Sequence, residues 1–245
     1  MPTRHLPRTN DERSTALNLC NVKYGATSNP SDRLITTAQW TTLTTRIPLW
    51  TNARDAAAVL LHTQTTATAA TTTAFDNLVR YVSHFIQVFN MAIARGTFTP
   101  SDRTYYQLDA SSDVVPDLKS NADIRLWAAR IATGEAARVL AGGAPMAMPT
   151  AAQVATAFTA YTSADSTQTS AKTAYDLGQE AVSTQRPTVD ALILDLWDTI
   201  EYNLRANDPT SLRRKAREWG VTYDNDETEA PVPPIPPVPP VPPTP

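Results

Sequence analysis

Residues that could carry out acid–base or metal chemistry gather in one stretch late in the chain. Asp195, Asp198 and Glu201 recur every three residues, which places them on one side of a helix. Such carboxylates could bind a metal ion or form a general acid–base pair. Dinuclear metal bundles also need Glu-x-x-His pairs on facing helices. The residues 114 positions earlier are Tyr81, His84 and Gln87. We therefore interpret the acidic residues as an exposed helix face; an enzyme would need a pocket that joins several of them to His84.

Other catalytic and cofactor motifs are missing from the sequence. Gly142-Gly143 is the closest pair of glycines and marks the end of a helix, so no phosphate-binding loop is expected. The three histidines do not form a His-x-x-x-His or Glu-x-x-His arrangement for zinc. Cys20 is the single cysteine, which excludes a disulfide framework and a thiolate metal site. We expect no catalytic, cofactor-binding or metal-binding residues, and therefore no enzyme.

Charge and hydropathy argue against nucleic-acid and membrane roles. The net charge is −3, so there is no basic excess to neutralise phosphates, and we expect no nucleic-acid partner. The basic run at residues 213–217 fits the last turn of a helix, where cations oppose the negative helix end. No stretch approaches the ~20 apolar residues of a membrane helix. Residues 1–13 lack the apolar run of a signal peptide, so a cytoplasmic location or export without a standard signal is expected.

Composition and periodicity predict an all-α fold. Glycine is scarce, with 7 residues, whereas all-β and doubly wound folds need glycine for tight turns. The clearest apolar stripe, which recurs at i, i+3, i+4 and i+7, consists of Phe75, Leu78, Val79, Val82, Ile86, Phe89 and Ile93. Helices are expected at residues 10–24, 36–71 (kinked or restarted near Pro48), 75–94, 117–141, 150–184, 188–206 (after Pro187) and 212–219.

The two halves of the chain register at a shift of 114 residues. Ala38-Gln39 falls on Ala152-Gln153, and the stripe from Phe75 falls on Val189, Leu192, Ile193, Leu196 and Ile200. This pattern predicts two duplicated helical hairpins that pair as a four-helix-type bundle, with extra short helices. The expected segments are an N-terminal helix and lead-in (1–35), a first hairpin (36–110), a connecting segment with a helix (111–149), a second hairpin (150–224), and an acidic hinge and polyproline tail (225–245).

Three features of the sequence occur together: the start Thr9-Asn10-Asp11-Glu12-Arg13, the Ala/Thr-rich long helices, and Thr99-Pro100-Ser101-Asp102-Arg103 followed by Leu108-Asp109. In these features the chain resembles uncharacterised bacterial (Bacteroidota-like) duplicated helical-bundle proteins with a proline-rich C-terminal stretch. The resemblance covers roughly residues 9–234. It implies a duplicated helical bundle and no catalytic residues.

The C-terminal tail repeats the pattern x-Pro-Pro over residues 231–245. Proline at this density forms a polyproline II helix with three residues per turn. One edge of this helix therefore carries Val232, Ile235, Val238 and Val241, which we predict to be the partner-binding residues. The alternative interpretation is a solvated stalk.

These features predict a non-enzymatic structural subunit of a larger, self-assembling and possibly filamentous complex. Charged residues are only 18% of the chain, so the Ala/Thr-rich helix faces are small and weakly charged. Such faces could pack closely against helices of neighbouring copies. A tail that docks on the next copy would make a head-to-tail contact between homo-oligomer subunits. The alternative is a monomeric adaptor whose proline-rich tail is recognised by another protein.

Overall fold

The computed structural model describes residues 3–224, so the tail and its four predicted partner-binding residues lie outside the described part. Within residues 3–224 the regular secondary structure is helical, and the fold is all-α as predicted. The helices are α1 (Asn10–Ala26), η1 (Pro30–Asp32), α2 (Thr37–Ala94), η2 (Pro100–Tyr106), α3 (Asn121–Leu140), α4 (Ala151–Leu204) and α5 (Pro209–Arg217). No helix in this range is both long and apolar enough to cross a membrane.

The two longest helices are uninterrupted where the sequence predicts hairpins. α2 has 58 residues and α4 has 54, and each contains one proline in its interior. Pro48 removes one backbone hydrogen bond at a cost of about 3 kcal/mol. Leu43 and Trp50 are buried on either side of it, and burying each contributes about 2–3 kcal/mol. Val182 and Val189 flank Pro187 in the same way. Buried anchors on both sides therefore offset each proline. The predicted break at Pro187 and the predicted restart near Pro48 were wrong, whereas a kink at Pro48 stays a prediction.

The predicted turn between residues 71 and 75 is also helical. Thr71, Thr72 and Thr73 each donate their hydroxyl to the carbonyl four residues earlier, at 3.0–3.1 Å. Threonine is a mediocre helix former, at a cost of up to about 0.7 kcal/mol per residue. Without a glycine or proline in this run, that penalty is too small to end a helix.

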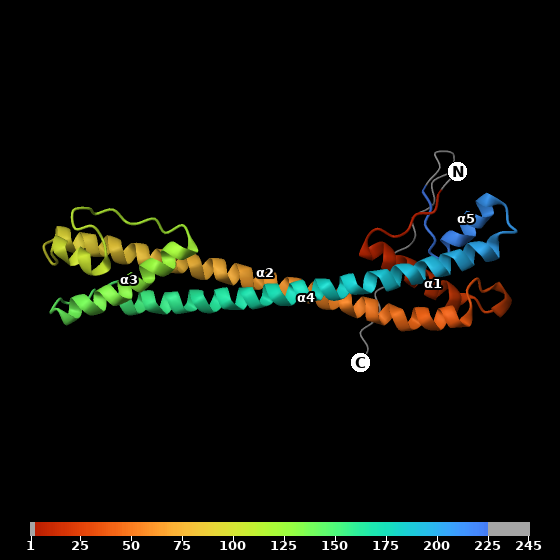
Figure 1. Cartoon of the computed structure of the whole chain (residues 1–245), viewed down its shortest axis with the longest axis horizontal. Helices are drawn as coiled ribbons and strands as arrows, with labels where there is room; N and C mark the ends of the chain where they lie inside the picture. Colours follow the sequence, from red (N-terminus) through yellow and green to blue (C-terminus); the bar gives the residue numbers. More distant parts are fainter. Residues whose placement is uncertain (1–2, 225–245) are drawn as a thin grey trace. The chain divides into compact units, whose positions relative to one another are not determined.

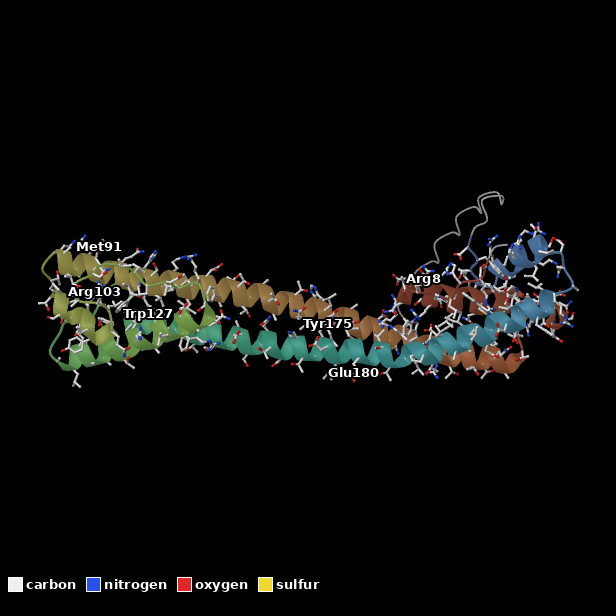
Figure 2. The ribbon with its side chains drawn as sticks, turned by 45° about the horizontal axis from the view of Figure 1, so that its top comes forward. Arg8, Met91, Arg103, Trp127, Tyr175 and Glu180 are labelled. Atoms are coloured by element: carbon white, nitrogen blue, oxygen red, sulfur yellow. The ribbon has the colours of Figure 1, made fainter. Side chains whose placement is uncertain are left out.

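The chain divides into two compact units that cut across the predicted segments. Unit 1 contains residues 3–53 and 182–224, and unit 2 contains residues 54–181. In Figure 1, unit 1 holds α1 (red), the start of α2, the end of α4, and α5 (blue). Unit 2 holds the rest of α2, η2, α3 (green) and the start of α4. Each unit therefore combines parts of both halves of the sequence.

Unit 2 has a core in which α2, η2, α3 and α4 all take part. Its buried residues include Leu78, Val82, Phe85, Ile86, Phe89, Tyr106, Ile124, Ala128, Ile131, Val154 and Tyr161. The rings of Phe89 and Tyr106 meet edge to face at 4.8 Å between centroids. Gly134 lets α3 approach η2, because a Cβ there would lie 2.6 Å from the Tyr105 carbonyl oxygen. The predicted stripe on residues 75–93 is thus confirmed as the core face of α2.

Unit 1 buries the second predicted stripe, together with aromatic residues from α1, from both long helices and from the segment after α5. Its buried residues include Leu17, Cys20, Tyr24, Leu43, Trp50, Val189, Ile193, Leu196, Trp197, Ile200, Trp219 and Val221. Arg13 of α1 forms two hydrogen bonds with Asp190 of α4, at 2.7 and 2.9 Å. Trp50 donates its indole N–H to Ser14 at 2.9 Å. These contacts hold α1 against both long helices of unit 1.

The long helices begin with the same capping arrangement at a shift of 114 residues. Thr36 accepts from the Gln39 amide at 3.2 Å, and the Gln39 side chain accepts from the Thr36 amide at 3.0 Å. Thr150 and Gln153 make the same reciprocal pair at 3.1 and 2.8 Å. Each pair satisfies two backbone donors at a helix start. The same shift places the end of α1 on the end of α3, a correspondence that the sequence analysis missed.

The turns that follow the long helices also match. Gln107 after η2 and Gly220 after α5 both have a positive φ, 59° and 90°. The Gln107 amide donates to Thr104 and the Leu108 amide to Arg103. In the same way, the Gly220 amide donates to the Arg217 carbonyl and the Val221 amide to the Ala216 carbonyl. Leu108 and Val221 are both buried after the turn, so each turn sends the chain back onto its unit.

Candidate functional site: a groove on unit 2

Three acidic residues near the end of α4, Asp195, Asp198 and Glu201, lie on unit 1, and each has a partner. The Arg4 guanidinium contacts Asp198 at 2.7 Å and Glu201 at 3.0 Å. The Tyr223 hydroxyl donates to the other oxygen of Glu201 at 2.5 Å. Gln39 donates to Asp195 at 2.8 Å. His84 belongs to unit 2, so the acidic residues and this histidine do not share one unit. The arrangement is an ion-paired surface.

Arg4 reaches this surface from an extended segment near the N-terminus. The His5 amide donates to the Thr222 carbonyl at 3.2 Å, and the Asp224 amide donates to the Thr3 carbonyl at 3.0 Å. Arg4 itself forms an antiparallel bridge with Tyr223. Burial and the hydrogen bond to Glu201 raise the pKa of the Tyr223 phenol, so it stays protonated as a donor. One face of α4 in unit 1 is therefore covered by extended chain that is held through opposite charges.

Unit 2 has a groove of about 560 Å³ that is lined by α2 and by residues around the start of α4. Its lining includes Arg80, Tyr81, His84 and Gln87 from α2, together with Pro149 and Gln153 at the start of α4. Arg80, His84 and Gln87 are exposed, whereas Tyr81 is half-buried. None of the residues that line the groove is acidic. The groove can therefore accept an anionic group near Arg80.

The groove and the covered face of unit 1 occupy matching positions. At the shift of 114 residues, His84 falls on Asp198 and Gln87 falls on Glu201, the two residues that Arg4 contacts. Gln153 falls on Gln39, which contacts the same face of α4. The face that carries carboxylates in unit 1 thus carries neutral or basic side chains in unit 2.

A buried polar network of unit 2 bonds to the loop that carries groove residues Met148 and Pro149. Arg138 of α3 donates to Glu135 at 2.8 Å, to the Tyr106 hydroxyl at 2.9 Å and to the Ala144 carbonyl at 2.7 Å. Glu135 also accepts from the Met146 amide at 2.6 Å and from the Tyr106 hydroxyl. Burial and the hydrogen bond to Glu135 raise the pKa of the Tyr106 phenol.

This network fixes the loop between α3 and α4, which ends at groove residue Pro149. The sequence analysis missed both the network and the groove. The Glu135–Arg138 spacing of three residues marks neighbours on one helix face. Sequence cannot show that this face is buried.

The tryptophans of unit 1 and the single cysteine are part of the packing of the fold. Trp50, Trp197 and Trp219 are buried in unit 1, and Trp40 stacks on Tyr24 at 4.9 Å between ring centroids. Burial raises the pKa of the Cys20 thiol to about 12, so little thiolate forms at neutral pH. Among residues 3–224, no three His, Cys, Asp or Glu side chains come together in a way that could hold a metal ion.

Comparison with known proteins gives no relative for this chain. No protein-family model matches the sequence, and no curated protein or solved structure matches it significantly.

Proposed function

We propose that the protein is a non-enzymatic structural subunit that assembles with further copies of itself, and that its proline-rich tail docks on a neighbouring subunit. The observation that carries this proposal is the weak internal packing of the two-helix stretch of unit 2. There, residues 54–73 of α2 run beside residues 162–181 of α4.

The two helices of this stretch meet through small residues. A Cβ on Gly178 would lie 2.8 Å from a Leu60 methyl group and 3.5 Å from the Ala57 Cα. The Thr71 hydroxyl donates across to the Ala164 carbonyl at 3.0 Å. The buried apolar residues of the stretch are Ala57, Ala67 and Ala171. Buried apolar area sets hydrophobic stabilisation, at about 25 cal/mol per Å², so alanines contribute little.

Larger aliphatic side chains of the same stretch face solvent. Val59 is 65% exposed, Leu61 is 45% exposed and Leu177 is 61% exposed. Packing against another copy would bury these side chains and add the stabilisation that the alanine contact lacks. The surrounding threonine hydroxyls bond to their own helix backbone, for example Thr63 to Val59 at 3.0 Å. These hydroxyls therefore need no water and are compatible with close helix packing.

We also propose that the chain is a duplication of one segment that contains a short helix, a long helix and a capped turn. The matching caps at Thr36 and Thr150 support this origin, as do the matching turns at Gln107 and Gly220. A duplicated bundle is the feature expected from the resemblance to the bacterial helical-bundle proteins. Two equivalent units in one chain suit a structural subunit, because they offer two related surfaces to neighbours.

Sedimentation velocity over a range of concentrations tests the assembly. We expect the full chain to associate, and the triple variant V59K/L61K/L177K to associate much less because the lysines cannot be buried without partners. V22K is the matched control, since Val22 is 60% exposed but lies on α1 of unit 1. A chain that ends at Glu229 tests the contribution of the tail. Monomers at every concentration would refute self-assembly and favour the adaptor, whose tail is recognised by another protein.

A further inference from the structure

We propose that the groove on unit 2 binds the acidic segment of a second copy, residues 225–229, which lies directly before the proline-rich tail. This inference rests on the proposed function, because it names the surface on which the tail region would dock. The segment has the sequence Asn-Asp-Glu-Thr-Glu and carries three carboxylates, Asp226, Glu227 and Glu229. It lies outside the described residues.

The covered face of unit 1 shows how this type of surface is occupied. There an extended segment lies against α4, and Arg4 places one positive charge between Asp198 and Glu201, at 2.7 and 3.0 Å. In unit 2 the matching positions are His84 and Gln87, and the lining adds the cation Arg80. Because the lining contains no acidic residue and includes the cation Arg80, the complementary occupant is an extended segment that carries carboxylates.

The length of the groove fits this occupant. The α2 residues that line it run from Asn77 to Val88, a rise of about 17 Å at 1.5 Å per residue. Five extended residues span about 17 Å at 3.3 Å per residue. Residues 225–229 therefore match the groove from end to end, with carboxylates within reach of Arg80 and His84.

The start of the segment also favours docking as extended chain. Asp224, the residue before it, donates its amide to the Thr3 carbonyl beside the Arg4–Tyr223 bridge. Tyr223 and Asp224 are therefore paired with the N-terminal segment directly before residues 225–229 begin. Twenty-one residues follow Asp224, and the proline-rich part begins directly beyond the acidic segment.

A charge exchange in the full-length chain tests the proposal. The groove variant R80E/H84E reverses the lining, and the tail variant D226K/E227K/E229K reverses the segment. Arg80 and His84 are exposed, so we expect both variants to fold as the wild type does, which circular dichroism checks. R95E is the control for charge reversal outside the groove, because Arg95 is exposed near the end of α2 and does not line the groove.

We expect each variant alone to require at least about tenfold higher concentration than the wild type to associate, measured by fluorescence-detected sedimentation. An equimolar mixture of the two should associate again in 1:1 proportion, because each reversed partner then meets its complement. R95E should behave as the wild type. A mixture that stays dissociated would overturn docking in a second copy.

Two further results separate this inference from the proposed function. If the wild type associates and R80E/H84E associates equally well, the groove assignment is wrong while the structural role stands. If no variant or wild type associates, the proposed function fails, and a labelled peptide of residues 224–235 is titrated into the full chain. Binding that is lost in R80E/H84E would still assign the acidic segment to the groove, whereas no binding would refute it.

Discussion

The buried charges of unit 2 allow a quantitative prediction about Arg138. Its guanidinium makes hydrogen bonds to Glu135, Tyr106 and the Ala144 carbonyl, and its side chain is 1% exposed. Replacing Arg138 with Met keeps the volume but leaves the Glu135 carboxylate buried without its cation. Removing one partner of a buried ion pair costs about 3–5 kcal/mol. We expect R138M to lower the free energy of unfolding by that amount.

Removing the whole network should cost less than breaking it. In the triple variant Y106F/E135M/R138M neither charge of this network remains, and the Met146 amide is the main donor left without its acceptor. That loss costs about 1–3 kcal/mol. The triple variant should therefore be more stable than R138M alone, although it carries two further substitutions.

Urea unfolding followed by far-ultraviolet circular dichroism measures both variants. Amide hydrogen exchange at α3 and η2 assigns the loss to unit 2. The groove provides a second measurement, because the network holds the loop that ends at Pro149. R138M should also weaken docking of the acidic peptide. If R138M costs less than about 1 kcal/mol, or less than the triple variant, the reasoning from buried charge is refuted.

Three further predictions concern the helices and the single thiol. P48A should raise the free energy of unfolding, measured in urea, by about 2 kcal/mol. The alanine N–H restores a helix hydrogen bond while Leu43 and Trp50 remain buried. An unchanged or lower stability contradicts this. Hydrogen bonds from the Ser211 hydroxyl and amide lower the pKa of the Asp208 carboxyl in the folded chain. The stabilisation from this carboxylate is therefore complete above its pKa in the unfolded chain, about 4, and is lost as the pH falls through its lower pKa in the folded chain. D208N keeps a capping side chain without this titration, so its stability should differ from the wild type by a smaller amount at pH 2 than at pH 7. Cys20 should react with a thiol reagent only after unfolding, because it is buried and its pKa is raised to about 12; rapid labelling of the native chain contradicts the assigned burial.

Local rules predicted the helix faces and the helix ends. The stripe on residues 75–93 and its counterpart from Val189 were predicted from spacing alone, because a helix that buries one face must repeat apolar residues every three or four positions. The caps that the structure shows at Thr9 and Asp208 also follow from local rules, since a side-chain oxygen that accepts a backbone N–H acts within three residues. The shift of 114 residues between the two halves also follows from the sequence, and the structure adds matching caps and turns in the two halves.

Tertiary structure decided the continuity of the helices and the composition of the units. Pro48 and Pro187 are helix breakers by local rules, yet buried residues on either side outweigh the lost hydrogen bond. That balance depends on contacts with α1 and with residues far away in the sequence. The same holds for the groove, whose lining joins α2 to residues near Pro149. Sequence alone determined which helix faces must be buried. Only the folded chain determined which residues cover each face and which face stays exposed. The reason is that burial depends on residues far away in the sequence, which local spacing does not specify.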